Sequence, residues 1–502
     1  MKRIFSSSLV AILAGLGLRL FFVLKFPADS GDAVLYEEIA TNWLKHHIYG
    51  MNLNGGIVPV DLRMPGYPAF LAFIYALTGK MAIAAHIWVM LAQVLVDLLG
   101  CVVIASLAAL LVSQAQGADK ARTARVFTAA LWLAALCPFT ANYTAVVMTE
   151  VFAIFLTGLT CVAFVPLVAT LRDDSAAGFL RHGTTGGFAA RRRADILSAF
   201  GGLFVGWATL FRPESPMLLL IAWVVLLAAA WKRTFLTGIR LCVISGIACA
   251  LPLAPWALRN AITLHEVQIL TPKYSNLPGE LVPRGFMAWE KTWLFRMRDC
   301  YLVPWKLEEE AIRIEDIPAR AFDSSEERSR VASILDEYNK TLHLTTEEDS
   351  QFAEIARERT ARHPLRTYLW IPAIRALTIW FAPRIELVPL SGKVFPLQQS
   401  WKEDPVDQCF TVGFVLLNIF YVIAAGLGAL KLWRCPAARS SLALLIAFLF
   451  VRTVFLTTLE TPEPRYVLVC FPIVLALAAQ IFVRRDPRQD PATNYPSSSG
   501  SG

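Results

Sequence analysis

The chain has 502 residues, of which 56% are hydrophobic, and a formal net charge of +8. Soluble domains contain about 45–50% apolar residues, so this composition excludes an ordinary soluble protein. The basic residues lie in short loops between apolar runs and form no stripe with aromatic residues, so we expect no nucleic-acid partner.

The first predicted element is a membrane span near residues 4–26. Its apolar run is longer than that of a usual signal peptide, and no convincing cleavage site follows, so we interpret it as an uncleaved span. This span contains Arg19. Arginine in hydrocarbon costs at least ~2.5 kcal/mol, so Arg19 should face a polar interior and bind either a phosphate or an acidic side chain such as Asp97.

A loop predicted to lie outside the cytoplasm follows at residues 27–83. It begins with Asp29 and Asp32, and the next residues have the apolar spacing of a short amphipathic helix on the membrane surface. Asp32 precedes this helix, where a carboxylate either caps the helix or takes a proton from an acceptor hydroxyl or amine; the two roles are compatible. Asp29 is the less favoured base. His46 and His47 point to different helix faces, which disfavours a shared metal site.

The same loop ends in the sequence DLRMPGYPAF. Its two prolines flank a glycine and fix the backbone path into an apolar helix, so Pro65 and Tyr67 are expected to shape the loop. Arg63 is a candidate for binding a phosphate.

Nine further spans are predicted, which gives about ten in an all-α polytopic membrane protein. Every second loop is basic, which places both termini in the cytoplasm and the protein in a bacterial inner membrane. The nine runs lie near residues 84–113, 126–141, 147–171, 196–211, 215–231, 236–258, 410–430, 441–458 and 464–483.

Charged residues recur at the outer ends of these spans. Glu150 begins one span, where it either benefits from the helix dipole or faces Asp32 to help position an acceptor or a metal. Arg212, Arg259 and Arg452 are candidates for binding a phosphate, with snorkelling to lipid headgroups as the alternative for Arg259. No cofactor is favoured, and the sequence leaves open whether a divalent metal ion is bound.

We divide the chain into four parts. A transmembrane module at residues 1–260 precedes an α-rich region outside the cytoplasm at 261–408. The apolar segment 364–388 carries regularly spaced arginines and is expected to lie in the membrane interface rather than cross it. The C-terminal spans occupy 409–484, and a disordered tail follows at 485–502.

Several motifs in order resemble a known family, the bacterial membrane glycosyltransferases of the GT-C fold. These are similar to dolichyl-phosphate-mannose–protein mannosyltransferases and to lipid A aminoarabinose transferases. The motifs are GDAVLYEEIATNWL with Asp32 and Tyr36, RMPGYPAFLA, MTE at 148–150, LFRPE ending at Glu214, PWALRN at 255–260 and EPRYVLVCFP at 463–472.

The resemblance implies specific roles. Asp32 occupies the place of the catalytic acid of the first outer loop, and Glu150 that of a second acidic residue. The donor would be a polyprenyl-phosphate-linked sugar, and transfer would invert the anomer. Because Gly31 precedes Asp32 where protein mannosyltransferases have an acidic pair, a protein acceptor is disfavoured.

The sequence therefore predicts a glycosyltransferase that transfers a sugar from a polyprenyl-phosphate donor to an extracytoplasmic glycan, lipid or protein, with Asp32 as the base. The alternative is a transporter or flippase for a lipid-linked or small solute. Against it, the polar residues gather at the outer face rather than at the bilayer midplane.

Overall fold

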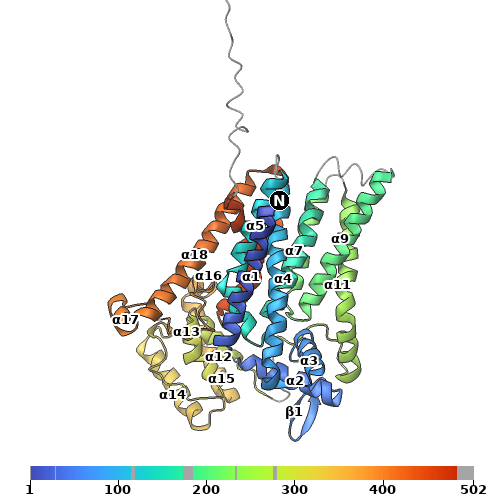
Figure 1. Ribbon diagram of the computed structural model, residues 1–502. Coiled ribbons are helices and arrows are strands. Elements are labelled where there is room, and N and C mark those ends of the chain that lie inside the picture. The colour runs from blue at the N-terminus through green and yellow to red at the C-terminus, as the bar shows by residue number, and fades with distance from the viewer. Residues whose placement is uncertain are drawn as a thin grey trace, which may run out of the picture.

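The computed structural model describes residues 2–28, 30–114, 119–172, 185–231, 234–274, 280–392 and 394–482. These residues form a bundle of long apolar helices with smaller elements gathered at one end (Figure 1). Within these described residues, seven helices are long and apolar enough to cross a membrane, and a bent pair of helices would add an eighth. The chain is a mostly helical, multi-pass membrane protein.

The candidate spans share one extensive apolar core. The bent pair consists of α5 (Lys120–Ala135) and the segment Pro138–Ala145, which comprises α6 (Pro138–Ala141) and η2 (Asn142–Ala145). The seven others are α1 (Lys2–Lys25), α4 (His86–Ser113) with the preceding η1 (Ala82–Ala85), α7 (Glu150–Arg172), α11 (Phe235–Thr263), α18 (Pro405–Trp433), α19 (Arg439–Thr457) with η6 (Pro436–Ala438), and the run of η7 (Pro464–Cys470), α20 (Phe471–Ala478) and η8 (Ala479–Phe482).

This number is smaller than the ten spans expected from sequence. The other two predicted spans are α9 (Thr185–Thr209) and α10 (Pro216–Ala230), both of which pack against the long helices. The 15 residues of α10 extend only about 22 Å at 1.5 Å per residue, short of a ~30 Å hydrocarbon core. The first half of α9 carries Arg191, Arg192, Arg193 and Asp195, so its apolar part is also short.

A β-hairpin within the first loop departs from the predicted all-α class. Strand β1 (Gly50–Leu53) pairs antiparallel with β2 (Gly56–Pro59). Between the strands, Asn54 and Gly55 both have positive φ, 50° and 84°. That is the conformation of a two-residue turn for which Asn-Gly is the preferred sequence. The Asn-Gly pair was a signal in the sequence for this hairpin, which the all-α prediction missed.

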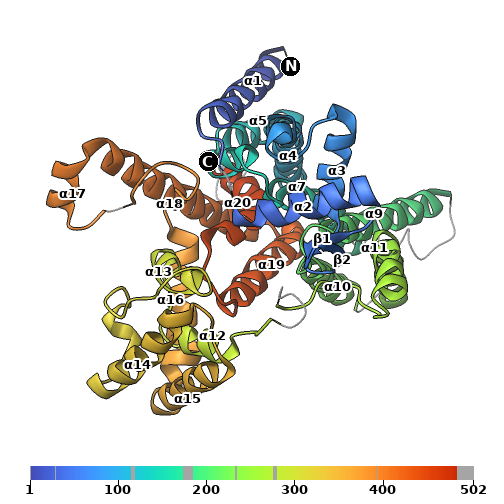
Figure 2. The ribbon, with the colours of Figure 1, turned by 90° about the horizontal axis from the view of Figure 1, so that it is seen from below.

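The remainder of the first loop is helical. Helix α2 (Gly31–His46) lies across the end of the bundle (Figure 2). It packs with α3 (Gly66–Thr78) and the beginning of α4 around a small apolar cluster that includes Ala40, Tyr67 and Leu71.

A second region, to one side of the bundle, has its own apolar core. Its two longest helices start with side-chain caps: Ser324 accepts a hydrogen bond from the Glu327 amide, and Thr345 forms a reciprocal capping box with Glu348. The elements of this region are α12 (Arg284–Lys291), α13 (Met297–Leu302), η3 (Pro304–Lys306), η4 (Ala319–Ala321), α14 (Ser325–Thr341) and α15 (Thr346–Arg362). We refer to residues 284–362 as the side region.

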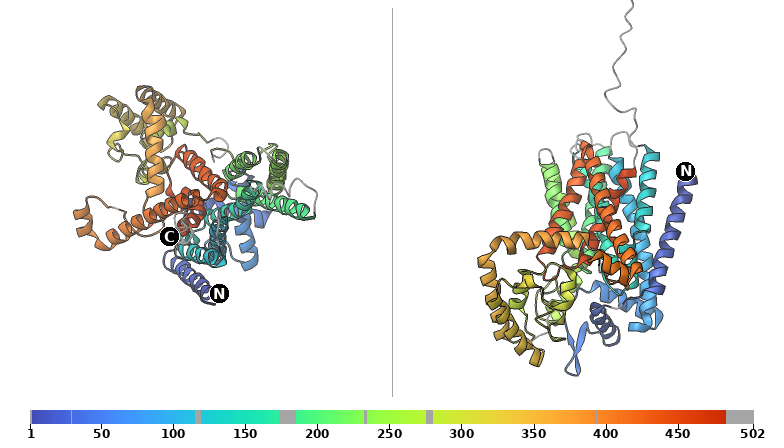
Figure 3. Two further views of the ribbon diagram at one scale, coloured as in Figure 1. Left: turned by 90° about the horizontal axis from the view of Figure 1, so that it is seen from above. Right: turned by 90° about the vertical axis from the view of Figure 1, so that its left-hand side faces the viewer.

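The segment after the side region leads back to the bundle. A π-helical turn, η5 (Arg366–Trp370), continues into α16 (Ile371–Phe381), which lies across the direction of the spans (Figure 3). Buried Arg375 on α16 donates from Nε to the Leu294 carbonyl at 2.6 Å and from Nη1 to the Leu459 carbonyl at 2.7 Å. It therefore joins the side region to the segment that follows α19. A short helix, α17 (Leu397–Glu403), precedes α18.

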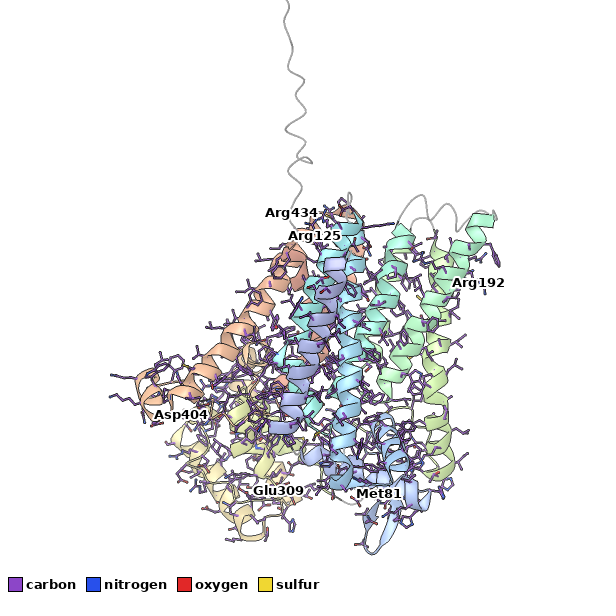
Figure 4. All side chains as sticks on the ribbon, in the orientation of Figure 1. Met81, Arg125, Arg192, Glu309, Asp404 and Arg434 are labelled. Atoms are coloured by element: carbon purple, nitrogen blue, oxygen red, sulfur yellow. The ribbon has the colours of Figure 1, made fainter. Side chains whose placement is uncertain are left out.

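Residues of three predicted basic loops lie at one end of the bundle. Arg125, Arg192 and Arg434, from three of the predicted basic loops, lie at one end, whereas Met81 and Glu309 lie at the other (Figure 4). Helix α2 is at this second end. The predicted disordered tail at 485–502 lies outside the described residues.

Candidate functional site

A cleft of about 1440 Å³ lies between the bundle and the side region. Its walls come from the start of α2, the turn between α9 and α10, the segment between α19 and η7, and the α13–η3 corner of the side region. Elements far apart in the sequence thus meet around one space. Asp32, Tyr36, Arg63, Arg212 and Arg465 all line it.

Asp32 lies in the first turn of α2 and holds two guanidinium groups. Its Oδ1 accepts from Arg63 Nη2 and its Oδ2 from Arg465 Nη2, each at 3.1 Å. The predicted role of Asp32 as a helix cap is wrong, because α2 begins at Gly31 with Ser30 in the cap position. The carboxylate instead forms salt bridges with the arginines and faces the cleft.

These arginines determine the acidity of Asp32. Burial alone would raise the pKa of the carboxyl, but Arg465 and then Arg63 outweigh it and hold the pKa below its usual value. Asp32 is therefore ionised at neutral pH.

Arg465 is itself held in place by Glu463. Glu463 Oε2 lies 2.5 Å from Arg465 Nε, and Glu463 Oε1 accepts from the Tyr466 hydroxyl at 2.7 Å. The Arg465 guanidinium also lies 5.1 Å from the Tyr466 ring centroid. Carboxylate and ring together fix the direction in which the guanidinium points.

Glu150 lies behind the cleft wall rather than on it. It is fully buried and forms an ion pair with Arg212, which does line the cleft. Because Glu150 touches Arg212 and not the cleft, its geometry suits a positioning residue.

Arg452 is part of the same buried network. Its Nη2 donates to Glu214 Oε1 and to the Tyr466 carbonyl, each at 3.2 Å. Arg212, Glu214 and Arg452 surround a cavity of about 10 Å³, the size of one water molecule. Arg452 therefore supports the cleft wall from behind.

The loop around Arg63 is fixed by close packing. The Gly66 amide donates to the Leu210 carbonyl at 2.7 Å, and a Cβ on Gly66 would lie 2.6 Å from that oxygen. Only glycine allows this approach, which links the Arg63 loop to the turn that carries Arg212. Pro65 is the cap residue of α3.

Two tyrosines of the predicted substrate loop differ in exposure to the cleft. Tyr36 lines the cleft, with the Arg63 guanidinium 5.9 Å from its ring, and burial followed by the charge of Asp32 raises its pKa to about 12. Tyr67 is buried and donates to Gln93 Oε1 at 2.7 Å. It supports α3 from within, and Asp29 lies outside the described residues.

Two of the predicted phosphate-binding arginines lie elsewhere. Arg19 is buried against Asp97, with Nε 2.6 Å from Oδ2, and also donates to the Gly15 and Ala135 carbonyls at 2.9 and 2.7 Å. Arg259 donates to the Tyr49 and Val60 carbonyls at 2.6 and 2.9 Å and so holds the β-hairpin to α11. The structure does not bring either residue to the cleft.

Within the described residues, no group of three or more His, Cys, Asp and Glu side chains is arranged to hold a metal ion. His86 pairs with Glu37 instead, which ties α2 to the start of α4.

The charged cleft residues that were not selected as site residues from the sequence include Glu463, Arg465 and Glu386. Arg465 and Glu463 share the EPRY motif, where a carboxylate two residues before an arginine at a span end was the available signal. Glu386 lies at the end of the predicted interfacial segment, and its sequence context gives no such signal.

Comparisons with known proteins give weak similarities. No family model and no curated protein matches the chain. Among solved structures it is similar to the oligosaccharyltransferase of Archaeoglobus fulgidus tethered with an acceptor peptide, with 12% identity and a TM-score of 0.49 over 95% of this chain and 49% of that one. The same enzyme, AglB, in complex with an inhibitory peptide and a dolichol-phosphate, has 11% identity and a TM-score of 0.47, over 95% of this chain and 50% of that one.

A second enzyme is also similar in structure. ArnT from Cupriavidus metallidurans, bound to undecaprenyl phosphate, gives 13% identity and a TM-score of 0.32, over 94% of this chain and 76% of that one. The chain spans about half the length of the archaeal enzyme. At these scores the similarities decide nothing about the reaction, and the functional argument rests on the site.

Proposed function

We propose that the protein is a membrane glycosyltransferase that takes a sugar from a polyprenyl-phosphate donor on the extracytoplasmic side of the membrane. The observation that supports this most directly is the meeting of one ionised carboxylate, Asp32, with Arg63, Arg212 and Arg465 in a single cleft. A carboxylate suits a proton acceptor and guanidinium groups suit a phosphate.

The proposed reaction is a single displacement. The acceptor hydroxyl oxygen attacks the anomeric carbon, and the bond from that carbon to the phosphate oxygen breaks. The electron pair leaves with the polyprenyl phosphate, whose charge the arginines stabilise. The acceptor proton passes to Asp32. Attack from the side opposite the leaving group inverts the anomeric configuration.

The salt bridges of Asp32 suggest how the base becomes active. With both carboxylate oxygens bound to arginine, Asp32 is a weak base. A donor phosphate competes for the same guanidinium groups, and any arginine that turns to the phosphate raises the proton affinity of Asp32. Donor binding would therefore prepare the base for the acceptor.

The test follows release of undecaprenyl phosphate by the purified protein in lipid, supplied with a panel of undecaprenyl-phosphate sugars and an envelope extract. Asp32→Asn is expected to lower release at least ~100-fold, the usual contribution of a positioned base. Asp336→Asn, at an exposed position on α14, is the matched control and should keep full activity.

Two results would contradict the proposal. One is full release by a folded Asp32→Asn variant. The other is movement of a lipid-linked or small solute across the membrane without covalent change to any donor, which is what a transporter would do.

A further inference from the structure

The α13–η3 corner of the side region presents two aromatic side chains to the cleft. Tyr301 is 51% exposed and Trp305 38% exposed, and their ring centroids lie 4.5 Å apart in an edge-to-face arrangement. Both line the same cleft as Asp32. The side region buries its other tryptophans, Trp289 and Trp293, almost completely. The exposure of Tyr301 and Trp305 therefore does not reflect a lack of core in which to bury aromatic rings.

A carboxyl group also lines this cleft. Glu386 follows α16, lines the cleft, and forms no ion pair within the described residues. Arg384, its nearest cation in sequence, is occupied by the Pro464 and Ile379 carbonyls at 2.7 and 3.1 Å. Burial raises the pKa of Glu386. Burial, followed by the negative charge of Glu386, also raises the pKa of Tyr301. Glu386 therefore lines the same cleft as the aromatic pair, and its charge acts on Tyr301.

We infer that Tyr301, Trp305 and Glu386 form the acceptor subsite and that the acceptor is a saccharide. Sugar rings present flat C–H faces that pack on aromatic rings, and neighbouring hydroxyl groups that donate to a carboxylate. A half-buried carboxyl without an ion-pair partner gains from such donors. The inference rests on the proposed function, because a sugar held on this wall would direct a hydroxyl group toward Asp32 across the cleft.

A peptide acceptor fits the wall less well. Extended peptides that bind by strand addition need an exposed strand edge. In the part of the chain that the structure describes, the two strands are β1 and β2, which do not line the cleft. The corner formed by α13 and η3 offers ring faces instead.

The test measures saturation-transfer NMR of methyl α-glycosides of glucose, mannose, galactose and N-acetylglucosamine with the full-length protein in lipid nanodiscs. The expected result is binding of at least one glycoside that Tyr301→Ala, Trp305→Ala and Glu386→Gln each weaken by about tenfold, the loss of one good contact. Trp401→Ala is the matched control, because Trp401 is exposed on α17 and away from the cleft. Circular dichroism and thermal unfolding check that each variant folds.

The outcomes of this test distinguish failure of the saccharide subsite from failure of the proposed function. Binding by none of the glycosides, or binding that the three substitutions leave unchanged, overturns the saccharide subsite. Binding of a threonine-containing hexapeptide, lost in the same variants, overturns it in favour of a peptide acceptor. Asp32-dependent release of undecaprenyl phosphate is measured in parallel. If release occurs and glycoside binding fails, only the acceptor inference fails; if release is absent, the proposed function itself fails.

Discussion

At the scale of single residues, the two guanidinium groups on Asp32 set its proton affinity. Burial opposes ionisation of the carboxyl, and Arg465 and Arg63 outweigh burial, so the pKa lies below its usual value. Activity that needs ionised Asp32 falls as the pH drops through this pKa. Removing one cation must therefore move that fall to a higher pH.

Arg465→Gln is expected to shift the acid limb of the kcat/KM profile to higher pH, in addition to lowering activity. The measurement is the rate of undecaprenyl phosphate release from pH 3.5 upward. A shift of the acid limb by one pH unit corresponds to a loss of ~1.4 kcal/mol of interaction between Asp32 and the arginine. Arg357→Gln is the control, because Arg357 is exposed on α15. An unmoved acid limb would show that Asp32 is not the titrating group.

Arg19 shows how a charge in a span is satisfied without a ligand. Arg19→Met leaves Asp97 buried without its cation, which typically costs about 3–5 kcal/mol. We expect a marked loss of thermal stability in detergent, with undecaprenyl phosphate release per folded molecule kept near the original rate. A variant with normal stability and no activity would instead place Arg19 in the reaction.

The chemistry of single residues predicted part of the site. The rest could not be predicted, because the sequence does not show which groups each charged residue contacts. Asp32 and Arg63 were selected because a carboxylate and an arginine in the first loop suit a base and a phosphate ligand. Arg212 was selected because a charge at a membrane boundary is costly unless it binds something. The same argument selected Arg19 and Arg259, since a sequence does not reveal that Asp97 or backbone carbonyls already satisfy them. For Glu463 the EPRY motif was an available local signal, whereas the role of Glu386 depends on folding that brings distant segments together, and no local pattern encodes it.

At the scale of secondary-structure elements, close packing at Gly66 sets the distance between the Arg63 loop and the Arg212 turn. Gly66→Ala would push a Cβ into the Leu210 carbonyl, 2.6 Å away. We expect the free energy of unfolding to fall by about 1–3 kcal/mol. Activity should fall more than this loss of folded protein explains, because Arg63 and Arg212 both move. Gly17→Ala, which meets no atom within 4 Å, is the matched control.

Thermal unfolding and undecaprenyl phosphate release together test this prediction. Equal activity of the Gly66→Ala and Gly17→Ala proteins would mean that the contact has no role in the site. The long spans were predictable from hydropathy alone. Hydropathy also located α9 and α10, but it wrongly counted them as full spans, because α10 has only 15 residues and the first half of α9 is charged. The hairpin was predictable from the turn sequence Asn54–Gly55, but the all-α prediction left it out.

At the scale of the whole molecule, the side region and the bundle are tied together next to the cleft. Arg375 bonds both Leu294 and Leu459, and Lys291 pairs with Glu460 at 3.1 Å. Both ties reach the segment that leads to Glu463 and Arg465. The position of the side region is therefore coupled to the arginine that holds Asp32.

Arg375→Met is expected to loosen that segment, because it leaves buried carbonyls unpaired at about 1–3 kcal/mol each. Hydrogen exchange at residues 457–466 should speed up roughly tenfold or more, with a parallel loss of transfer activity. Arg330→Met, which breaks an exposed pair with Glu358 inside the side region, is the control. Unchanged exchange at 457–466 would contradict the coupling.

The contact between Asp32 and Arg465 also has a consequence for biosynthesis. The carboxylate is made near the beginning of the chain and its guanidinium partner more than 400 residues later. During translation Asp32 reaches its final side of the membrane long before Arg465 leaves the ribosome. Until the last span is inserted, Asp32 therefore lacks one of its two salt bridges, and the arginine cluster around it stays incomplete.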